Sequence, residues 1–221
     1  MADPREVSSK RRSRLGSTRV RGLYAITPDV ADTVRLCGAV EQALDGGASI
    51  LQYRNKTASR ELRSLQAHAL AALCARHDVE FIVNDDLDLA LRIEGAGLHV
   101  GVEDDDDLGA IRRALGPDRL VGVSCYASVD RARAAVAAGA DYVAFGSVFA
   151  SPTKPAAARA PLDLFVTARE LGVPLVGIGG ITLENLAQLI AAGADAAAVI
   201  SELFGAPDVR NRARELTRCF D

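Results

Sequence analysis

Short apolar runs and longer Ala- and Leu-rich stretches alternate along almost the whole sequence. The apolar runs predict strands at 22–26, 49–53, 80–83, 97–100, 120–123, 141–145, 174–178 and 196–200. The stretches between them predict helices near 33–45, 59–77, 86–94, 106–115, 128–138, 162–171, 182–192 and 207–219. The predicted strands are continuously apolar, which is typical of parallel strands buried on both faces. Eight successive βα units predict an α/β chain folded as a single-domain (β/α)8 TIM barrel, with a doubly wound sheet as the alternative.

A short turn motif recurs between the predicted helices and strands. Gly47-Ala48-Ser49, Gly139-Ala140-Asp141 and Gly193-Ala194-Asp195 each follow a helix and precede a strand, and Gly95-Ala96-Gly97 is a fourth variant. Glycine ends helices readily because it adopts left-handed dihedral angles without a Cβ clash. The repeated turn therefore marks the amino ends of the strands, and we expect functional residues at their carboxyl ends.

The composition limits the partners and the compartment. The 221 residues suffice for one core, and a net charge of −3 gives no global basic field for nucleic acid. No apolar run approaches the length of a membrane span, and the first residues do not resemble a signal peptide. The four cysteines (37, 74, 125 and 219) are widely spaced without a C-x-x-C pair, which favours reduced thiols. We expect a cytoplasmic protein without membrane or nucleic-acid partners; the sequence leaves a homo-oligomer open.

Basic residues crowd the start of the chain, among Ser, Gly and Pro. They are Arg5, Lys10, Arg11, Arg12, Arg14, Arg19 and Arg21. This composition predicts that residues 1–20 form a mostly disordered tail and that residues 21–221 form the barrel. A nucleic-acid-binding arm is the alternative interpretation of the tail.

The pentapeptide 52–56 (QYRNK) directly follows the second predicted strand. If the strand alternation continues through it, Gln52, Arg54 and Lys56 lie on one side. An amide and two cations without an interleaved acid suit an anion rich in oxygens, such as a diphosphate. A solvated strand end with ordinary surface charge is the alternative.

Acidic residues follow the next two predicted strands. Asn84, Asp85 and Asp86 come after the third strand, and Asp86 is the better candidate to cap the following helix. An acidic run at 103–107 comes after the fourth strand and suits a solvated helix start. Because the two strands are neighbours, Asp85 and one acid of this run are candidates to share a hard cation such as Mg²⁺.

The later strand ends supply candidates for a second anion site. Ser151, Thr153 and Lys154 lie on a Pro-containing loop after the sixth strand, as a phosphate clasp or an ordinary surface turn. Backbone N–H groups after the last two strands, near 177–182 and 200–201, suit a phosphate. His99, within the fourth strand, is interpreted as a core residue, and Cys125 lacks a histidine partner that would make it a nucleophile.

These motifs together resemble the thiamine-phosphate synthase family. The matching segments run from about Gly22 to Phe204 and are QYRNK, VNDD, GLHVGVED, GVS, GSVFASPTK, GIGGI and VIS, in the family's order. The resemblance implies a (β/α)8 barrel that joins 4-amino-5-hydroxymethyl-2-methylpyrimidine diphosphate to 4-methyl-5-(2-hydroxyethyl)thiazole phosphate. It also implies Mg²⁺ as cofactor, thiamine phosphate and pyrophosphate as products, and a dissociative substitution.

The resemblance also assigns roles to individual residues. The pyrimidine diphosphate would be held by Gln52, Arg54, Lys56, Asn84 and Lys154. Mg²⁺ would be bound by Asp85 and Asp104, and Ser124 would lie beside the reacting groups. The thiazole phosphate would be received by Ser151, Thr153, Gly180, Ile200 and Ser201. Arg54, Lys56, Ser124 and Lys154 would be the catalytic set.

The sequence departs from the family pattern at three places. Val102 stands where Gln is frequent, Cys125-Tyr126 replaces a common Thr-His pair, and Ser151 stands where Thr is usual. The first two departures put details of the pyrimidine site in doubt. The competing functions are a related thiazole tautomerase, which needs no diphosphate and metal apparatus, and a non-catalytic thiamine-phosphate sensor.

Overall fold

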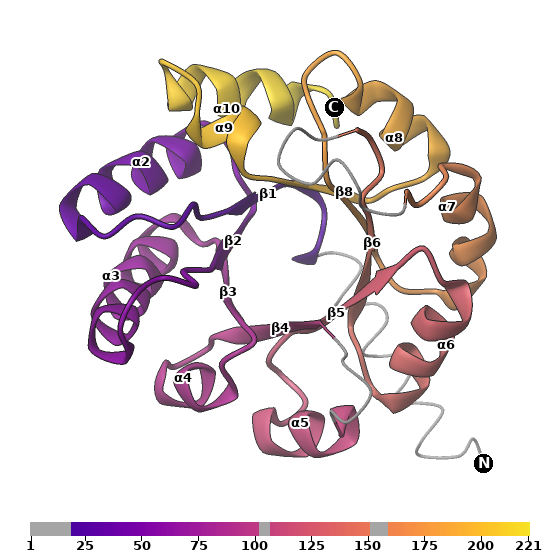
Figure 1. Ribbon diagram of the computed structural model, residues 1–221, viewed down its shortest axis with the longest axis horizontal. Helices are drawn as coiled ribbons and strands as arrows, with labels where there is room; N and C mark the ends of the chain where they lie inside the picture. The colour runs from indigo at the N-terminus through magenta and orange to yellow at the C-terminus, as the bar shows by residue number, and fades with distance from the viewer. Residues whose placement is uncertain (1–18, 102–106, 151–158) are drawn as a thin grey trace.

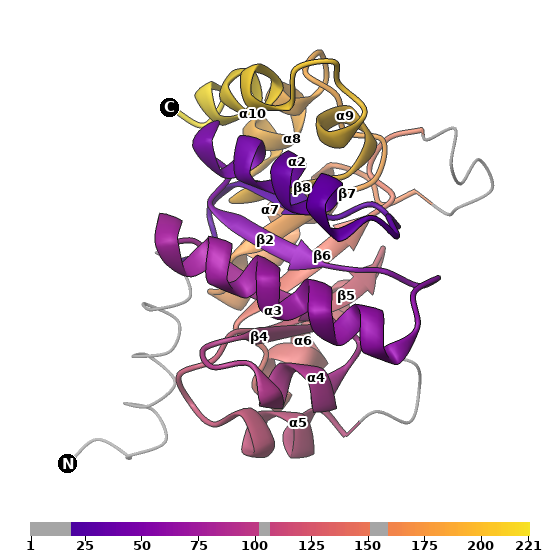
Figure 2. The same cartoon turned by 90° about the vertical axis from the view of Figure 1, so that its left-hand side faces the viewer.

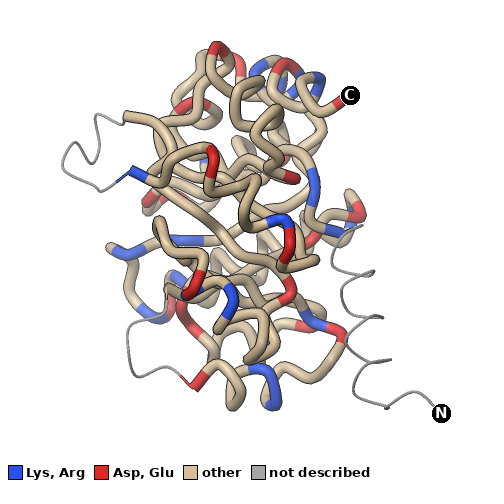
Figure 3. Tube along the Cα trace, turned by 90° about the vertical axis from the view of Figure 1, so that its right-hand side faces the viewer, with Lys and Arg blue, Asp and Glu red and all other residues tan. Residues whose placement is uncertain are grey.

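Eight parallel strands close into a barrel in the order β1-β2-β3-β4-β5-β6-β7-β8, with helices around the outside (Figure 1). The computed structural model describes residues 19–101, 107–150 and 159–221. The TIM barrel predicted from the alternating pattern is therefore confirmed, and the doubly wound sheet is excluded. Acidic and basic positions are interspersed over the face seen in Figure 3.

The strands are short and lie close to their predicted positions. They are β1 (Gly22–Ile26), β2 (Ile50–Tyr53), β3 (Glu80–Asn84), β4 (Gly97–Gly101), β5 (Val121–Tyr126), β6 (Tyr142–Gly146), β7 (Leu175–Ile178) and β8 (Ala196–Val199). In the side view the labelled strands point toward one end of the barrel, which is its mouth (Figure 2). The carboxyl ends of all the strands meet there.

The helices also follow the prediction, with differences at their ends. They are α2 (Thr33–Asp45), α3 (Arg60–His77), α4 (Leu87–Arg92), α5 (Leu108–Leu115), α6 (Val129–Ala138), α7 (Asp163–Ala168), the 3-10 helix η1 (Arg169–Leu171), α8 (Leu186–Ala192), α9 (Ser201–Phe204) and α10 (Val209–Arg218). Among the described residues, none of these helices has the length and apolarity to cross a membrane.

The repeated Gly-Ala turn has the predicted conformation and an additional role. Gly47, Gly139 and Gly193 have φ of 101°, 108° and 108°, in the left-handed region. In two of these turns the following aspartate binds the start of the neighbouring strand: Asp141 accepts from Val121 N and Asp195 from Leu175 N, both at 2.8 Å. The turn therefore fixes neighbouring βα units relative to each other.

A buried ion pair stabilises the amino end of the barrel. Arg112, from α5, bonds the Asp141 carboxylate, and both side chains are at most 8% exposed. The same guanidinium donates to the carbonyl oxygens of Gly139, Gly116 and Arg119 at 2.8–3.0 Å. Because these donors and acceptors satisfy one another, the charges are tolerated away from water.

Two apolar clusters make up the core. One lies between the strands and the surrounding helices. The other fills the inside of the barrel and includes Val20, Tyr24, Ile50, Tyr142 and Val176. Val20 is fully buried, and Arg19 binds Glu80 and Asp118 O at the amino end of the barrel. These last two residues of the predicted tail therefore pack on the barrel.

Candidate active site

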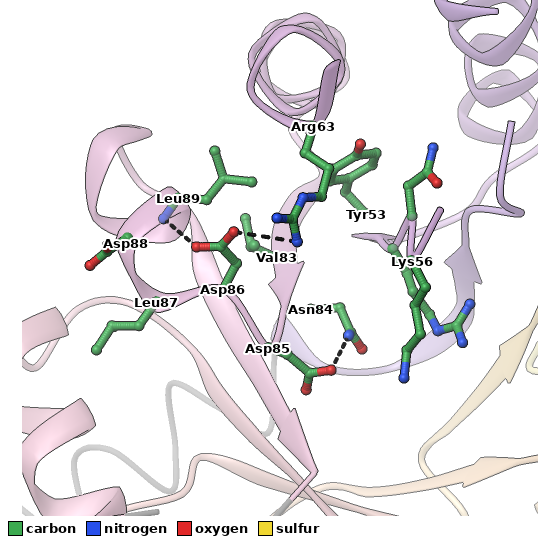
Figure 4. Close-up of a pocket in the computed structure, with 12 residues that line it drawn as sticks. Tyr53, Lys56, Arg63, Val83, Asn84, Asp85, Asp86, Leu87, Asp88 and Leu89 are labelled. Atoms are coloured by element: carbon green, nitrogen blue, oxygen red, sulfur yellow. Dashed lines mark hydrogen bonds and ion pairs between the residues drawn. The ribbon is translucent and has the colours of Figure 1, made fainter. Parts of the chain in front are cut away.

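A pocket of about 390 Å³ opens at the mouth between the ends of β2 and β3 (Figure 4). It is lined by Tyr53, Arg54, Asn55, Lys56, Arg63, Val83, Asn84, Asp85, Asp86, Leu87, Asp88 and Leu89. Arg54, Lys56, Asn84 and Asp85, predicted from two separate motifs, therefore lie together. The strand register explains this proximity. Tyr53 of β2 pairs with Val83 of β3, so the segments that follow the two strands leave the sheet side by side.

The loop that carries Arg54 and Lys56 is held by the segment after β1. Arg54 N donates to Thr27 Oγ1 at 2.9 Å, and the Thr27 hydroxyl donates to Arg54 O at 2.9 Å. Asp29 Oδ1 accepts from Lys56 N at 3.1 Å and from Arg54 Nη1 at 3.3 Å. Strand alternation therefore ends at Tyr53, and hydrogen bonds with the segment after β1 position Arg54 and Lys56.

Asn55 holds the inside of the same loop. It is 5% exposed; its amide donates to Val30 O and to Gln66 Oε1, each at 3.1 Å. Its Oδ1 accepts from the backbone N of Thr57 and of Ala58. Asn55 thus orders the QYRNK loop while its neighbours on either side face the pocket.

Asp85 presents its carboxylate at the mouth in an uncommon backbone conformation. Its φ is 60°, a region that Asp and Asn tolerate better than most residues. Asn84 Nδ2 donates to Asp85 Oδ2 at 2.6 Å, and Asp85 N donates to His99 O at 2.9 Å. Asp86 caps α4 by accepting from Leu89 N at 2.9 Å, as predicted, so Asp85 remains available to a ligand.

Gln52 does not share the surface of Arg54 and Lys56, which corrects the expectation from strand alternation. It is 3% exposed and points into the barrel, where its Nε2 donates to Tyr24 Oη at 2.8 Å. Ser124, half-buried on β5, also contacts this interior, with its Oγ 2.9 Å from His99 Nε2. Gln52 and Ser124 therefore lie inside the barrel, beneath the mouth.

His99 lies in the barrel core, as its sequence position predicted. Burial lowers the pKa of its imidazole from 6.5 to about 4, although Asp85 favours the charged form. The ring is therefore neutral near pH 7. A neutral imidazole donates one hydrogen bond and accepts another.

This buried histidine should make the folded protein less stable in mild acid. Between pH 6.5 and about 4 the unfolded chain binds a proton at His99 that the folded chain does not bind, so the free energy of unfolding falls as pH falls. The contribution approaches about 3 kcal/mol at pH 4. Denaturant titrations at several pH values should show a shallower fall in His99→Gln than in wild type. The exposed-residue control His68→Gln should keep the wild-type slope, and equal slopes in all three proteins would contradict this account.

The ends of β7 and β8 form a second part of the mouth. Gly180 and Ile200 each lie two residues beyond the paired residues Ile178 and Ala198. Gly180 has φ of 67°, and a Cβ there would lie 2.4 Å from Ala150 O, so the loop after β6 packs directly on it. Ser201 begins the short helix α9 and is exposed. These three predicted residues therefore lie together, across the barrel from the β2–β3 pocket (Figure 1).

A family model described as thiamine monophosphate synthase matches residues 23–203, which is most of the 221-residue chain. The chain belongs to this family. The resemblance inferred from the strand-end motifs is thus confirmed.

Curated relatives of the thiamine monophosphate synthase family extend over nearly the whole chain. A thiamine-phosphate synthase from Aromatoleum aromaticum is 58% identical over 205 residues, covering 92% of this chain and 98% of that protein. One from Methylobacillus flagellatus is 53% identical over 202 residues, covering 91% and 96%. A solved structure, thiamine phosphate pyrophosphorylase from Pyrococcus furiosus, is 32% identical with a TM-score of 0.79, covering 90% and 95%. A 3-hexulose-6-phosphate synthase, 19% identical with a TM-score of 0.68 and covering 90% and 100%, shares the fold.

Several expected residues of the family site lie outside the described residues. They are Asp104, Ser151, Thr153 and Lys154, together with the departure Val102. Of the other departures, Cys125 is fully buried, which raises the pKa of its thiol to about 12 and agrees with its exclusion as a nucleophile. Tyr126 is 52% exposed and lies under the Arg131 guanidinium, 5.3 Å from the ring centre.

Two residues that line the pocket, Arg63 and Asn55, and one that holds its loop, Asp29, were not predicted from the sequence. Arg63 comes from α3, and its Nη1 lies 3.8 Å from Asp86 Oδ2. Asp29 and Asn55 hold the cationic loop, as described above. Asn55 lies within the QYRNK motif, where its position between two cations was the available signal; Arg63 and Asp29 carry no local signal.

Proposed function

We propose that this chain is a thiamine-phosphate synthase with the two substrates implied by its motifs, the pyrimidine diphosphate and the thiazole phosphate. The carrying observation is that Arg54, Lys56, Asn84 and Asp85 line one pocket at the mouth of a barrel of this family. Cations and a carboxylate side by side suit a diphosphate with its metal ion. The curated relatives that share at least half of the sequence have this activity in their names.

The β2–β3 pocket is the diphosphate site in this proposal. Arg54 and Lys56 face it from the loop after β2, and Arg63 adds a third cation from α3. Arg63 Nε is buried without a hydrogen-bond partner among the described residues, so it retains a donor. A guanidinium fork matches phosphate oxygens well. Lys154, outside the described residues, is proposed as a further cation for the same group.

The residues at this pocket fit Mg²⁺ in their chemistry. Asp85 offers an exposed carboxylate, and Asn84, whose NH₂ bonds Asp85, keeps its amide oxygen as an acceptor. Within the described ranges no three His, Cys, Asp or Glu residues form a metal-binding group. Mg²⁺ usually takes one or two protein carboxylates plus water and phosphate oxygens. Asp85 and Asp104 would therefore hold the ion, which when bound neutralises charge on the leaving diphosphate.

The chemical step breaks the bond between the pyrimidine methylene carbon and the diphosphate oxygen. The electron pair leaves with pyrophosphate, where Arg54, Lys56 and Lys154 stabilise the added charge. The aminopyrimidine ring delocalises the positive charge left on the methylene. The thiazole nitrogen then donates its lone pair to that carbon, forming the new C–N bond. No protein nucleophile is needed, in agreement with the buried, protonated Cys125 thiol.

The ends of β7 and β8 are proposed to hold the thiazole phosphate. Gly180, Ile200 and Ser201 meet there, and Ser151 and Thr153 are proposed to add hydroxyl donors. Anchoring the two substrates at opposite sides of the mouth brings the thiazole nitrogen and the methylene carbon together, which lowers the entropic part of the barrier.

Pyrophosphate release tests this function. We expect release only when both substrates and Mg²⁺ are present, and we expect a trifluoromethyl group in place of the pyrimidine 2-methyl to slow the chemical step by more than about 100-fold, or about 3 kcal/mol. The reason is that electron withdrawal destabilises a cationic pyrimidine. Single-turnover rates with the two pyrimidines measure the effect. Equal rates would contradict the dissociative step, and thiazole isomerisation without pyrophosphate release would identify a tautomerase.

We further propose that the protein acts in the cytoplasm. All four cysteines are free in the structure, which agrees with a reducing compartment.

A further inference from the structure

Five polar side chains from five strands form a continuous hydrogen-bonded chain across the inside of the barrel. Gln52 Nε2 lies 2.8 Å from Tyr24 Oη, which lies 2.8 Å from Tyr142 Oη. Tyr142 Oη lies 3.1 Å from His99 Nδ1, and His99 Nε2 lies 2.9 Å from Ser124 Oγ. We call these five residues the interior relay. It connects β2 with β5 beneath the mouth.

The interior relay is buried except at Ser124, which is half-buried. Tyr142, Tyr24 and Gln52 are 0%, 1% and 3% exposed. The backbone makes room for it: a Cβ on Gly122 would lie 1.9 Å from Tyr142 Cζ, so only glycine fits beside that ring. His99 stacks on the same ring, with centres 5.6 Å apart. Because a buried polar group without a hydrogen bond destabilises the fold, each donor in the relay must face an acceptor.

One direction of donation follows from the groups present. The Gln52 NH₂ can only donate, so Tyr24 Oη accepts from it. Of the two printed partners of Tyr24 Oη, only Tyr142 Oη can accept a proton, so a satisfied Tyr24 hydroxyl donates to Tyr142. Tyr142 then donates to His99 Nδ1, which must be unprotonated to accept, so the ring proton lies on Nε2 and is donated to Ser124 Oγ. The Ser124 hydroxyl proton is left to point toward a ligand at the mouth.

We propose that Tyr24, Tyr142 and His99 are positioning residues that fix the Ser124 hydroxyl as a hydrogen-bond donor to the bound pyrimidine. The inference rests on the proposed function for the identity of this ligand, whose ring nitrogens are acceptors. A serine hydroxyl in water rotates freely and donates or accepts. Here one of its two acceptor lone pairs is taken by His99, which restricts the rotation of the hydroxyl and leaves its proton for the substrate.

The tautomer of His99 tests the direction without any activity measurement. In protein labelled with ¹⁵N-histidine, the protonated and unprotonated ring nitrogens give well-separated shifts, and His99→Gln assigns the His99 signals. We expect His99 to be protonated on Nε2 alone in wild type and on both nitrogens in exchange in Tyr142→Phe. Tyr53→Phe is the matched control, because it removes a buried hydroxyl bonded to Gln66, outside the relay, and should leave the His99 signals unchanged. Protonation on Nδ1 in wild type would overturn the proposal.

A kinetic cycle tests whether the relay acts through Ser124. We expect Tyr142→Phe to lower kcat for pyrophosphate release by up to about tenfold, as for one lost hydrogen bond, with the KM for thiazole phosphate unchanged. In a Ser124→Ala background the same substitution should have no further effect. Equal effects in both backgrounds would show a general structural role and overturn the proposal. Failure of the proposed function appears differently, as no pyrophosphate release by wild type, while the tautomer result is unaffected.

Discussion

Replacing Asp85 with asparagine is expected to slow pyrophosphate release by on the order of 10²- to 10³-fold while the barrel remains folded. Asparagine has the same shape, tolerates the φ of 60°, and keeps an oxygen that can accept from Gly101 N. The substitution therefore removes the negative charge and the oxygen that accepts from Asn84 Nδ2, and it preserves the shape of the side chain. Rates at saturating substrates over a series of Mg²⁺ concentrations, with thermal unfolding of the same samples, measure the effect.

The control for this substitution is Asp130→Asn. Asp130 is an exposed acid in the first turn of α6, paired with Arg133, and it does not line the β2–β3 pocket. Its rate should equal that of wild type. An Asp85→Asn enzyme with an unchanged rate and an unchanged dependence on Mg²⁺ would remove Asp85 from the proposed metal site.

Asp141→Ala is expected to lower the free energy of unfolding by about 3–5 kcal/mol. The change leaves the Arg112 guanidinium buried without its counter-charge and takes the acceptor away from Val121 N. Breaking one side of a buried, hydrogen-bonded ion pair is among the most destabilising single changes. Denaturant unfolding followed by circular dichroism gives the free energy, and kcat of the folded fraction should be unchanged because the pair lies at the amino end.

An exposed ion pair provides the comparison. Arg133→Met breaks contacts with Asp130 and Glu170, whose side chains are 93% and 57% exposed, and should lower the free energy of unfolding only slightly because water screens these charges. A loss for Asp141→Ala no larger than that for Arg133→Met would show that the buried pair contributes little to stability.

The fold was predictable because its signals are local and repeated. Continuous apolar strands, amphipathic helices and left-handed glycines recur along the chain, and each can be recognised within a few residues. The bonds from Asp141 and Asp195 to neighbouring strands were not predictable, since they span 20 residues and depend on the register of the sheet. Likewise, Arg19 and Val20 belong by composition to the polar tail, and their packing on the barrel depends on residues distant in sequence, such as Glu80.

The candidate site was predictable where a motif lies directly at a strand end. Arg54, Lys56, Asn84 and Asp85 follow this rule, and the barrel brings them together. Gln52 lies within β2 and points into the barrel, whereas Arg54 and Lys56 lie beyond the end of the strand, where the alternation no longer applies. The tyrosines of the interior relay were not predictable, because each lies within an apolar run that reads as core, and they are 118 residues apart in sequence.

The filled interior and the closed amino end of the barrel determine how substrates enter and products leave. Val20, Ile50, Tyr142 and Val176 leave no passage along the barrel axis, so the mouth is the sole way in and out through the described part of the barrel. Two substrates and two products of the proposed reaction must use the same opening. A bound product excludes the next substrate. The rate of product release through the mouth therefore sets an upper limit on kcat, and a faster chemical step does not raise that limit.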